Sequence, residues 1–304
     1  MTGMIKQKLM SLAVAANRIT ERAHLRLQPV HYYSEVPNRR WLEQHRSEWA
    51  HPALPAGIDW DLDSQLVWLS RICSAHLSEV PALSEWQSGL GFGPGYGPIE
   101  AQVLRCFVRS EQPEHVVEVG SGMSTAVIFR ASETNNLHGG RISEITCVEP
   151  YPREALRSLD VRLIESGALS VPLAVFTELK SGDLLFIDST HALHTGSELI
   201  RLYLDILPAL APGVLVHIHD IYLPYMYSPD VLSTLFDWQE TVLLAALLIN
   251  NPKLKVRCCL SALSHERPHE LRKILPDYRP ASFTDGLGIT GNSHFPASIW
   301  LESV

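Results

Sequence analysis

The stretch VVEVGSGMST at residues 116–125 decides the fold. Apolar residues flank one acid, Glu118, and are followed by Gly120 and Gly122 within three positions. This order predicts a buried strand that turns sharply into a helix, because glycine permits the tight backbone that such a turn needs. The turn would bring the backbone close to a small polar ligand, although nucleotide sites and plain tight turns use glycines in the same way.

The surrounding chain has the composition of a globular protein with a small-molecule partner. Its 304 residues and 46% hydrophobic content are enough for one large domain with an appendage, or for two smaller domains. The formal net charge is -8, and no block of Lys and Arg is long enough to form a stripe that binds polyanions. We therefore expect no nucleic-acid partner.

Cysteine usage predicts a reducing compartment. The chain has 5 cysteines, an odd number, without CxxC spacing and mostly within apolar runs. This pattern is typical of buried free thiols in a cytoplasmic protein.

No segment is predicted to cross a membrane. The N-terminal stretch MTGMIKQKLMSLAVAANRITER carries two lysines and a short apolar run, as a secretory signal does, but its pattern continues into an Arg- and Glu-rich helical stretch. An amphipathic helix is therefore favoured over a signal peptide. The longest other apolar run, TVLLAALLIN at 241–250, is too short to span a bilayer.

The texture of the sequence changes near residue 98. Residues 1–98 carry helical periodicity in pieces, broken by proline-bearing loops and by the glycine-dense GLGFGPGYGP at 89–98, which predicts a helical cap and a lid-like loop. Residues 99–304 alternate short apolar strands with helical stretches, as βαβ units on a parallel sheet do. We expect strands at 115–119, 142–149, 161–165, 184–188 and 214–220, and near 256–260 and 297–302. We expect helices at 99–109, 123–137, 152–158, 172–180, 195–210 and 230–249.

Two acids near the glycine turn indicate the kind of ligand. Glu118 stands just before the glycines, where a dinucleotide-binding fold normally has an apolar residue. A carboxylate there would repel a pyrophosphate and attract a cationic amine. Glu149, at the end of the next predicted strand, is placed to accept both hydroxyls of a ribose. Together the two acids favour a nucleoside that carries a positive charge.

The motifs VVEVGSGMST, TCVEP, LLFIDSTH and PGVLVHIHDIYLP, in this order and spacing, resemble those of the S-adenosylmethionine-dependent methyltransferases. The resemblance is strongest to the branch with Asp-x-x-His after strand four and His-Asp at the end of strand five. It covers about residues 95–304, and its strongest motifs lie between 116 and 227.

This resemblance implies an α/β fold: a Rossmann-like, seven-stranded, mostly parallel sheet with an antiparallel last strand, here with a helical N-terminal extension. It implies an enzyme whose cofactor is S-adenosylmethionine, with the methionine part near the glycine turn, the ribose at Glu149 and the adenine beside the turn at Ser166 and Gly167. The implied cofactor-binding residues are Glu118, Gly120, Ser121, Gly122, Ser124, Thr125, Glu149, Ser166, Gly167 and Asp188. Ser124 or Thr125 could also cap the helix that follows the turn.

The ends of strands four and five carry the residues expected to do the chemistry. Because the cofactor already holds an activated methyl group, the protein must align an acceptor and remove its proton. In the catechol-type methyltransferases, an Asp after strand four and an Asp-Asn pair after strand five bind a divalent cation. The resemblance therefore implies a metal site at Asp188, His219 and Asp220, with Mg²⁺, Mn²⁺ and Fe²⁺ all open because an imidazole ligand is softer than a carboxylate.

His191 is the expected general base, with Asp188 beside it as a second catalytic residue. It falls where the catechol-type enzymes have a lysine, and an imidazole with an ordinary pKa near 6.5 accepts a proton at neutral pH more readily than a lysine does. The two aspartates could instead only cap loops, and His217 is expected in the sheet packing. Glu240, on the following helix, could point back to the site, but a position on the solvated side of that helix is favoured.

Aromatic residues suggest the acceptor surface. Tyr96 in the glycine-rich loop and Tyr222 and Tyr225 after strand five could form walls for a flat or sugar-like acceptor. Ordinary loop packing would use them equally well.

Several functions stay open. O-methylation of a small molecule or saccharide hydroxyl is favoured, over metal-free methylation of an amine or carboxylate. His217 and His219 with an aspartate could form an iron site of an oxygenase, the HxHD string also occurs in metallo-hydrolases, and a non-catalytic metabolite-binding protein could keep the same fold. The helical N-terminal region could mediate a homodimer by burying an apolar face.

Overall fold

The computed structural model describes residues 3–26, 28, 34, 36–79, 95–281, 285–288 and 293–304. The chain divides into two compact units, Met1–Trp49 and Ala50–Val304. This division lies upstream of the expected boundary at residue 98, because helix α4 (Leu62–Cys73) packs on α6 (Pro98–Glu111) and on strand β6 (Leu254–Cys259). Of the glycine-rich loop expected at 89–98, residues 89–94 lie outside the described residues.

The first unit consists of helices in its described part. These are α1 (Gly3–Thr20), the short η1 (Glu21–Ala23), α2 (Arg39–Gln44) and α3 (Arg46–Trp49). The helix predicted at the N-terminus is confirmed, and its side chains Met10, Leu12, Val14 and Ile19 are exposed. Among the residues described, no helix has both the length and the apolar character needed to cross a bilayer.

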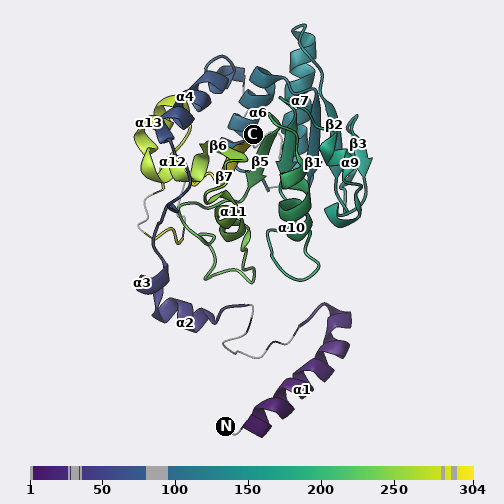
Figure 1. Ribbon diagram of the computed structural model, residues 1–304, viewed down its shortest axis with the longest axis vertical. Coiled ribbons are helices and arrows are strands. Elements are labelled where there is room, and N and C mark those ends of the chain that lie inside the picture. The colour runs from purple at the N-terminus through teal and green to yellow at the C-terminus, as the bar shows by residue number, and fades with distance from the viewer. Residues whose placement is uncertain are drawn as a thin grey trace. The chain divides into compact units, whose positions relative to one another are not determined.

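The second unit is built on a seven-stranded sheet with the order β3-β2-β1-β4-β5-β7-β6 (Figure 1). The strands are β1 (His115–Val119), β2 (Glu144–Val148), β3 (Arg162–Ile164), β4 (Leu184–Ile187), β5 (Leu215–His219), β6 and β7 (Ser298–Ser303). β1 to β5 are parallel, while β7 runs antiparallel to both β5 and β6. The predicted fold, a mostly parallel sheet with an antiparallel last strand, is confirmed.

The register aligns the carboxyl ends of the central strands β1, β4 and β5. Val119 of β1 pairs with Ile187 of β4, and Ile187 pairs with Ile218 of β5, so the residues that follow emerge side by side. Gly120 has φ of 80°, and a Cβ there would collide with the carbonyl oxygen of Asp188. The lack of a side chain at Gly120 therefore lets its backbone lie close to the backbone of Asp188, at the end of β4.

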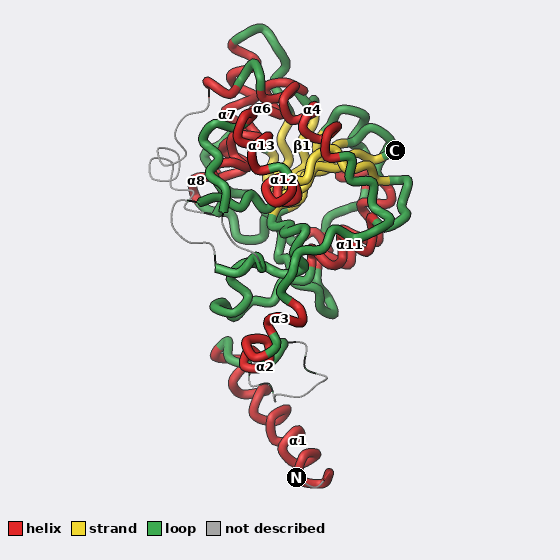
Figure 2. The backbone as a smooth tube through the Cα atoms, turned by 90° about the vertical axis from the view of Figure 1, so that its left-hand side faces the viewer, coloured by secondary structure: helices red, strands yellow, loops and turns green. Residues whose placement is uncertain are grey.

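Helices cover both faces of the sheet, and Figure 2 shows the strands enclosed between them. One face packs against α4, α6, α7 (Met123–Leu137), α12 (Leu260–Glu266) and α13 (Pro268–Ile274), with a core that includes Phe107, Phe186 and Trp300. The other packs against α9 (Ala174–Thr177), α10 (Glu198–Arg201) and α11 (Glu240–Leu248). Alternation along β5 turns Leu215 and His217 toward the first face and Val216 and Ile218 toward the second.

Several predicted helices are shorter than expected. The helix predicted at 230–249 begins only at Glu240, because the backbone of Ser233 and Thr234 bonds to the carbonyl of Asp230 and forms turns instead. The helix predicted at 195–210 is α10, followed by a π-helical turn (Leu202–Ile206) and a 3₁₀ turn (Leu207–Ala209). The stretches expected at 152–158 and 172–180 are single turns, α8 (Glu154–Arg157) and α9, and α12 and α13 were not predicted.

Candidate functional site

Three predicted site residues meet at the carboxyl ends of β4 and β5. His191 Nε2 lies 3.2 Å from Asp188 Oδ1 and 3.5 Å from Asp220 Oδ2. One ligand atom from each of these residues lies within 4.8 Å of the others, a spacing that could hold a metal ion. The carboxyl ends of parallel strands are where ligands bind in open α/β sheets, so this cluster is the candidate catalytic centre.

His219 borders the same carboxylates. Its Nδ1 lies 3.3 Å from Asp188 Oδ1 and 3.7 Å from Asp220 Oδ2. The ring is buried, and its centroid is 4.8 Å from that of Tyr96. The structure therefore brings together all three residues predicted to bind a metal, and adds His191 to them.

The backbone at the cluster is in an uncommon conformation. His191 has φ of 56° and Asp220 has φ of 54°, the left-handed region that residues other than glycine rarely adopt. Such positions cost free energy and concentrate at functional sites.

The charges of the cluster favour bound protons or a cation. Burial alone would lower the pKa of His191, but hydrogen bonds to Asp188 and Glu240 outweigh burial and raise this pKa to about 10. Burial would likewise lower the pKa of His219, yet the carboxylates of Asp188 and Asp220 raise it to about 9. Burial would raise the pKa of Asp188, but the two imidazoles hold this pKa below its ordinary value. Oxygen donors with imidazole beside them suit a divalent cation, so the residues present fit a metal.

Glu240 is a site residue that the sequence analysis misplaced. It is fully buried, with Oε2 2.7 Å from His191 Nδ1, and its Oε1 accepts a hydrogen bond of 2.9 Å from the Tyr203 hydroxyl. The expectation of a solvated position was wrong because Glu240 is the first residue of α11 and faces the loop after β4. The available signal was a lone acid at the start of the otherwise nearly apolar stretch ETVLLAALL.

The turn after β1 and the end of β2 form the candidate cofactor site. Glu149 accepts backbone N–H groups on both carboxylate oxygens, from Ser121 at 3.1 Å and Tyr151 at 2.8 Å. These bonds fix the carboxylate, and each oxygen keeps a lone pair for a further donor such as a ribose hydroxyl. A Cβ at Gly122 would meet no atom within 4 Å, so this side of the turn has room for a ligand. The residues present thus fit a nucleoside cofactor.

Glu118 lies beneath that turn. It is fully buried, and Ser124 Oγ donates to its Oε1 at 2.6 Å while Thr125 Oγ1 donates to its Oε2. Burial raises the pKa of Glu118 to about 7, although both hydroxyls lower it. Thr125 Oγ1 also accepts the N–H of Gly122 at 3.0 Å, so Thr125 makes the predicted cap bond and Ser124 does not. In this structure Glu118 anchors the first turn of α7.

The turn expected to border the adenine follows β3. Ser166 Oγ donates to the Gly167 carbonyl at 3.3 Å, and both residues are half-buried. The next peptide N–H, from Ala168, is held by the Glu198 carboxylate at 3.2 Å.

The three predicted substrate tyrosines have different surroundings. Tyr222 donates to Asp220 Oδ1 at 3.0 Å, and Tyr96 lies against His219 with its hydroxyl 3.3 Å from His217 Nε2. Tyr225 instead packs against Tyr227, His265 and Phe295.

His217 occupies the predicted position in the sheet packing. It is fully buried, stacks on Phe186 with ring centroids 4.5 Å apart, and contacts Trp300. Burial lowers its pKa well below the ordinary value, so the ring is neutral. A ring enclosed in this way does not offer the open coordination position that an iron oxygenase needs.

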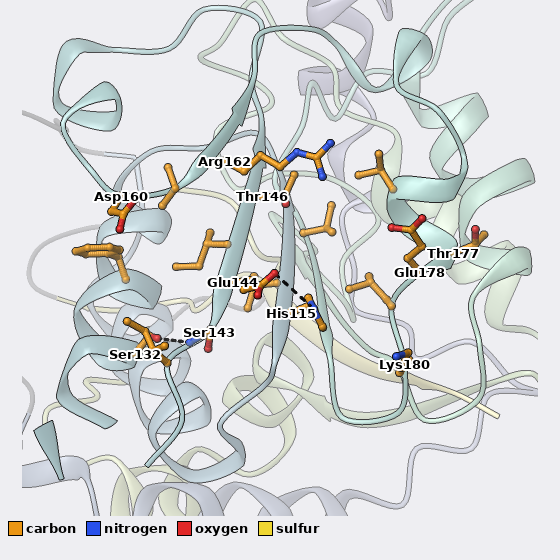
Figure 3. A pocket seen from close by; sticks show the side chains of 18 of the residues that line it. His115, Ser132, Ser143, Glu144, Thr146, Asp160, Arg162, Thr177, Glu178 and Lys180 are labelled. Carbon is orange, nitrogen blue, oxygen red and sulfur yellow. Dashed lines mark hydrogen bonds and ion pairs between the residues drawn. The ribbon is translucent and has the colours of Figure 1, made fainter. Parts of the chain in front are cut away.

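A pocket of about 1170 Å³ lies near the amino ends of β1, β2 and β3, at the end of these strands opposite to the cluster (Figure 3). His115, Glu144 and Arg162, at the start of β1, β2 and β3, contribute to its lining, and His115 Nε2 is 3.7 Å from Glu144 Oε2. Because it lies at the amino ends of the strands, it is separate from the cluster and from the glycine turn.

The sheet order, the glycine turn after β1, the acid after β2 and the cluster after β4 and β5 are the features that the sequence resemblance implied for the class of Rossmann-like, S-adenosylmethionine-dependent methyltransferases. In agreement with this class, residues 117–221 match a family model described as a methyltransferase domain.

Solved structures with a similar chain course include three methyltransferases. An O-methyltransferase from Bacillus cereus, in complex with SAH, is 12% identical with a TM-score of 0.44, covering 79% of this chain and 100% of that chain. TomG, an O-methyltransferase from Streptomyces achromogenes involved in tomaymycin synthesis, is 13% identical with a TM-score of 0.39, covering 78% and 89%. MycE of the mycinamycin biosynthetic pathway, in complex with Mg, SAH and mycinamycin VI, is 18% identical with a TM-score of 0.33, covering 48% and 40%. These values are too low to transfer a substrate or a site to this chain. A comparison with curated proteins gave no match.

Proposed function

We propose that the protein transfers a methyl group from S-adenosylmethionine to a hydroxyl oxygen of a small molecule or saccharide, with His191 as general base and Asp188, His219 and Asp220 as the site of a divalent cation. The observation that carries this proposal is the cluster of two imidazoles and two carboxylates at the ends of β4 and β5. A hydroxyl acceptor suits the cluster because its proton must leave, whereas a neutral amine attacks without losing a proton first.

The cofactor residues orient the donor in this proposal. Glu149 would accept the ribose hydroxyls, Gly122 would face the methionine part, and Ser166 and Gly167 would border the adenine. When bound, S-adenosylmethionine supplies a methyl group on a positively charged sulfur, whose carbon–sulfur bond breaks as the carbon–oxygen bond forms.

The cluster prepares the acceptor. Nε2 of His191 would take the hydroxyl proton once a cation neutralises Asp188 and Asp220 and so lowers the pKa of the ring, which the carboxylates now raise to about 10. Tyr222 holds Asp220 in place through its 3.0 Å hydrogen bond. A divalent cation held there would supply Lewis-acid polarisation of the acceptor oxygen and would compensate the carboxylates that now raise the pKa of His191. Tyr96 and Tyr222 would border the acceptor.

Methyl transfer to catechol, used as a probe acceptor, tests this proposal through the S-adenosylhomocysteine formed. EDTA is expected to abolish transfer, and Mg²⁺, Mn²⁺ or Fe²⁺ to restore it. His191→Ala is expected to slow transfer by about 10²- to 10⁴-fold, the usual contribution of a general base, with unchanged cofactor affinity. If the chelator-treated protein transferred methyl groups at the full rate, the proposed metal requirement would be wrong. If His191→Ala kept full activity, His191 would not be the general base.

A further inference from the structure

The carboxylate of Glu240 reaches His191 from the side opposite to the cluster. His191 Nδ1 is 2.7 Å from Glu240 Oε2, while Nε2 of the same ring faces Asp188 and Asp220. Glu240 is itself held, because Tyr203 donates to its other oxygen at 2.9 Å. Tyr203, Glu240 and His191 thus form a continuous hydrogen-bonded chain that runs from the π-helical turn Leu202–Ile206 through the start of α11 to the cluster.

The backbone around His191 is tied to the same helix end. The N–H groups of Gln239 and Glu240 donate to the His191 carbonyl at 3.1 and 3.3 Å, and the Gln239 side chain accepts the N–H of Leu193 at 3.2 Å. The ring of Trp238 lies 4.8 Å from that of His191. Main chain and side chain of His191 are therefore both fixed by the start of α11.

A carboxylate acceptor on one ring nitrogen determines which nitrogen is available on the other side. The hydrogen bond keeps a proton on Nδ1, so Nε2 is the atom that can exchange a proton or bind a ligand. This is the arrangement by which an orienting carboxylate prepares a histidine for catalysis or metal binding.

We propose that Glu240 is a positioning residue that holds the Nδ1 proton of His191 and aims Nε2 at the carboxylates of Asp188 and Asp220. The proposal rests on the proposed function for the use made of Nε2, but the hydrogen bond itself can be tested without the cofactor. A structural explanation is weaker, because a buried carboxylate costs free energy and a glutamine would satisfy the Tyr203 hydroxyl equally well.

The test is the ring N–H resonance of His191 in the full-length, chelator-treated protein labelled with ¹⁵N-histidine. The resonance is assigned by its absence from His191→Ala. In the native chain we expect a downfield, slowly exchanging Nδ1 proton. Glu240→Gln is expected to remove or strongly shift it, Glu240→Asp to shift it less, and Tyr203→Phe to retain it.

Glu302→Gln is the matched control. Glu302 is a half-buried carboxylate that pairs with Arg257 at 2.6 Å, so its loss should leave the His191 resonance unchanged. A native spectrum without a hydrogen-bonded Nδ1 proton at His191 overturns the proposal, and this result needs no variant to fold. An unchanged resonance in a folded Glu240→Gln overturns it as well.

Binding of S-adenosylhomocysteine separates this proposal from the proposed function. Glu240→Gln is expected to keep the native affinity while losing the resonance. If the native protein bound no S-adenosylhomocysteine but showed the Nδ1 proton, the proposed function would fail and the hydrogen bond would stand. A parallel loss of cofactor affinity, melting temperature and resonance in Glu240→Gln would mean that Glu240 is only structural.

Discussion

At the scale of single residues, the charge of the site is set by three carboxylates that surround two imidazoles. Asp188 and Asp220 lie within 3.7 Å of both His191 and His219, and Glu240 adds a third acid on the far side of His191. Each carboxylate stabilises a protonated imidazole. The negative charge of the cluster is therefore compensated only when the imidazoles are protonated or a cation is bound.

Glu149 gives the most direct residue-scale prediction for the cofactor. If Glu149 binds the ribose as we propose, Glu149→Ala removes two charge-assisted hydrogen bonds to it. We then expect a loss of about 2 kcal/mol, or roughly 30-fold in affinity for S-adenosylmethionine, measured by calorimetry. Glu154→Ala, which removes an exposed acid from the nearby α8, is the control and should bind normally. Equal affinities of the two variants would contradict the placement of the ribose.

The sequence predicted the residues of the cluster but not their connections. Asp188, His191 and Asp220 could be placed because each follows a strand whose end is marked by its motif. Glu240 could not, because it is 49 positions from His191 and its burial depends on where α11 begins. The surroundings of Tyr225 likewise depend on α12 and on residues near 286, which carry no motif.

At the scale of elements, a partly buried ion pair joins two of the helices that precede the sheet. Arg109 of α6 donates from Nε to Glu79 Oε2 at 2.7 Å and from Nη2 to Glu79 Oε1 at 3.1 Å. Glu79 ends the short helix η2 (Leu77–Glu79), so this pair joins η2 to α6. The hydrogen bonds to Arg109 lower the pKa of Glu79 to about 2 from an ordinary value of 4.5.

This shift predicts a pH-dependent contribution to stability. A carboxyl with a depressed folded-state pKa stabilises the fold above its unfolded value of 4.5, and this contribution is lost as the pH falls toward 2. Glu79→Gln should therefore reduce the free energy of unfolding by about 2 kcal/mol at pH 7 and by clearly less near pH 3, measured by denaturant titration. The exposed pair Arg130–Glu133 gives the control, since Glu133→Gln should change little at either pH. A pH-independent difference for Glu79→Gln would exclude the ion pair as its cause.

The strands and the long helices α6 and α7 were predicted to within a few residues, whereas the helix expected at 230–249 was not. Runs such as HVVEV and LLFID are short, apolar and bounded by turn residues, and each coincides with a strand within one or two residues. The stretch at 230–239 has the composition of a helix, but Asp230 bonds its side chain to Ser228 and its carbonyl to Ser233 and Thr234. Tertiary packing decides whether such a stretch forms local turns or a helix. The hydrophobic periodicity of the sequence carries no information on that packing.

At the scale of the whole molecule, every predicted cofactor, metal and base residue lies in the unit Ala50–Val304. Its five cysteines are buried and free, as predicted from their spacing. The unit Met1–Trp49 supplies none of these residues, and α1 exposes Leu12 and Ile19 one heptad apart.

The homodimer expected from the sequence can be tested at these exposed side chains. Sedimentation is expected to show a dimer for the native chain and a monomer for the double variant Leu12→Glu and Ile19→Glu, because charges would prevent burial of this apolar face. Val67→Glu is the control, as Val67 is equally exposed but lies on α4. If the native chain stayed monomeric at every concentration, the predicted homodimer would be wrong.

We propose that the glycine turn, Glu149 and the cluster form one methyl-transfer site. Calorimetric titration of the chelator-treated protein with S-adenosylmethionine and S-adenosylhomocysteine, with and without Mg²⁺, Mn²⁺ or Fe²⁺, tests it most directly. We expect micromolar binding of both nucleosides and a separate heat of metal binding that Asp188→Asn removes. Absence of nucleoside binding under every condition would contradict the proposal, and would leave VVEVGSGMST as a structural turn.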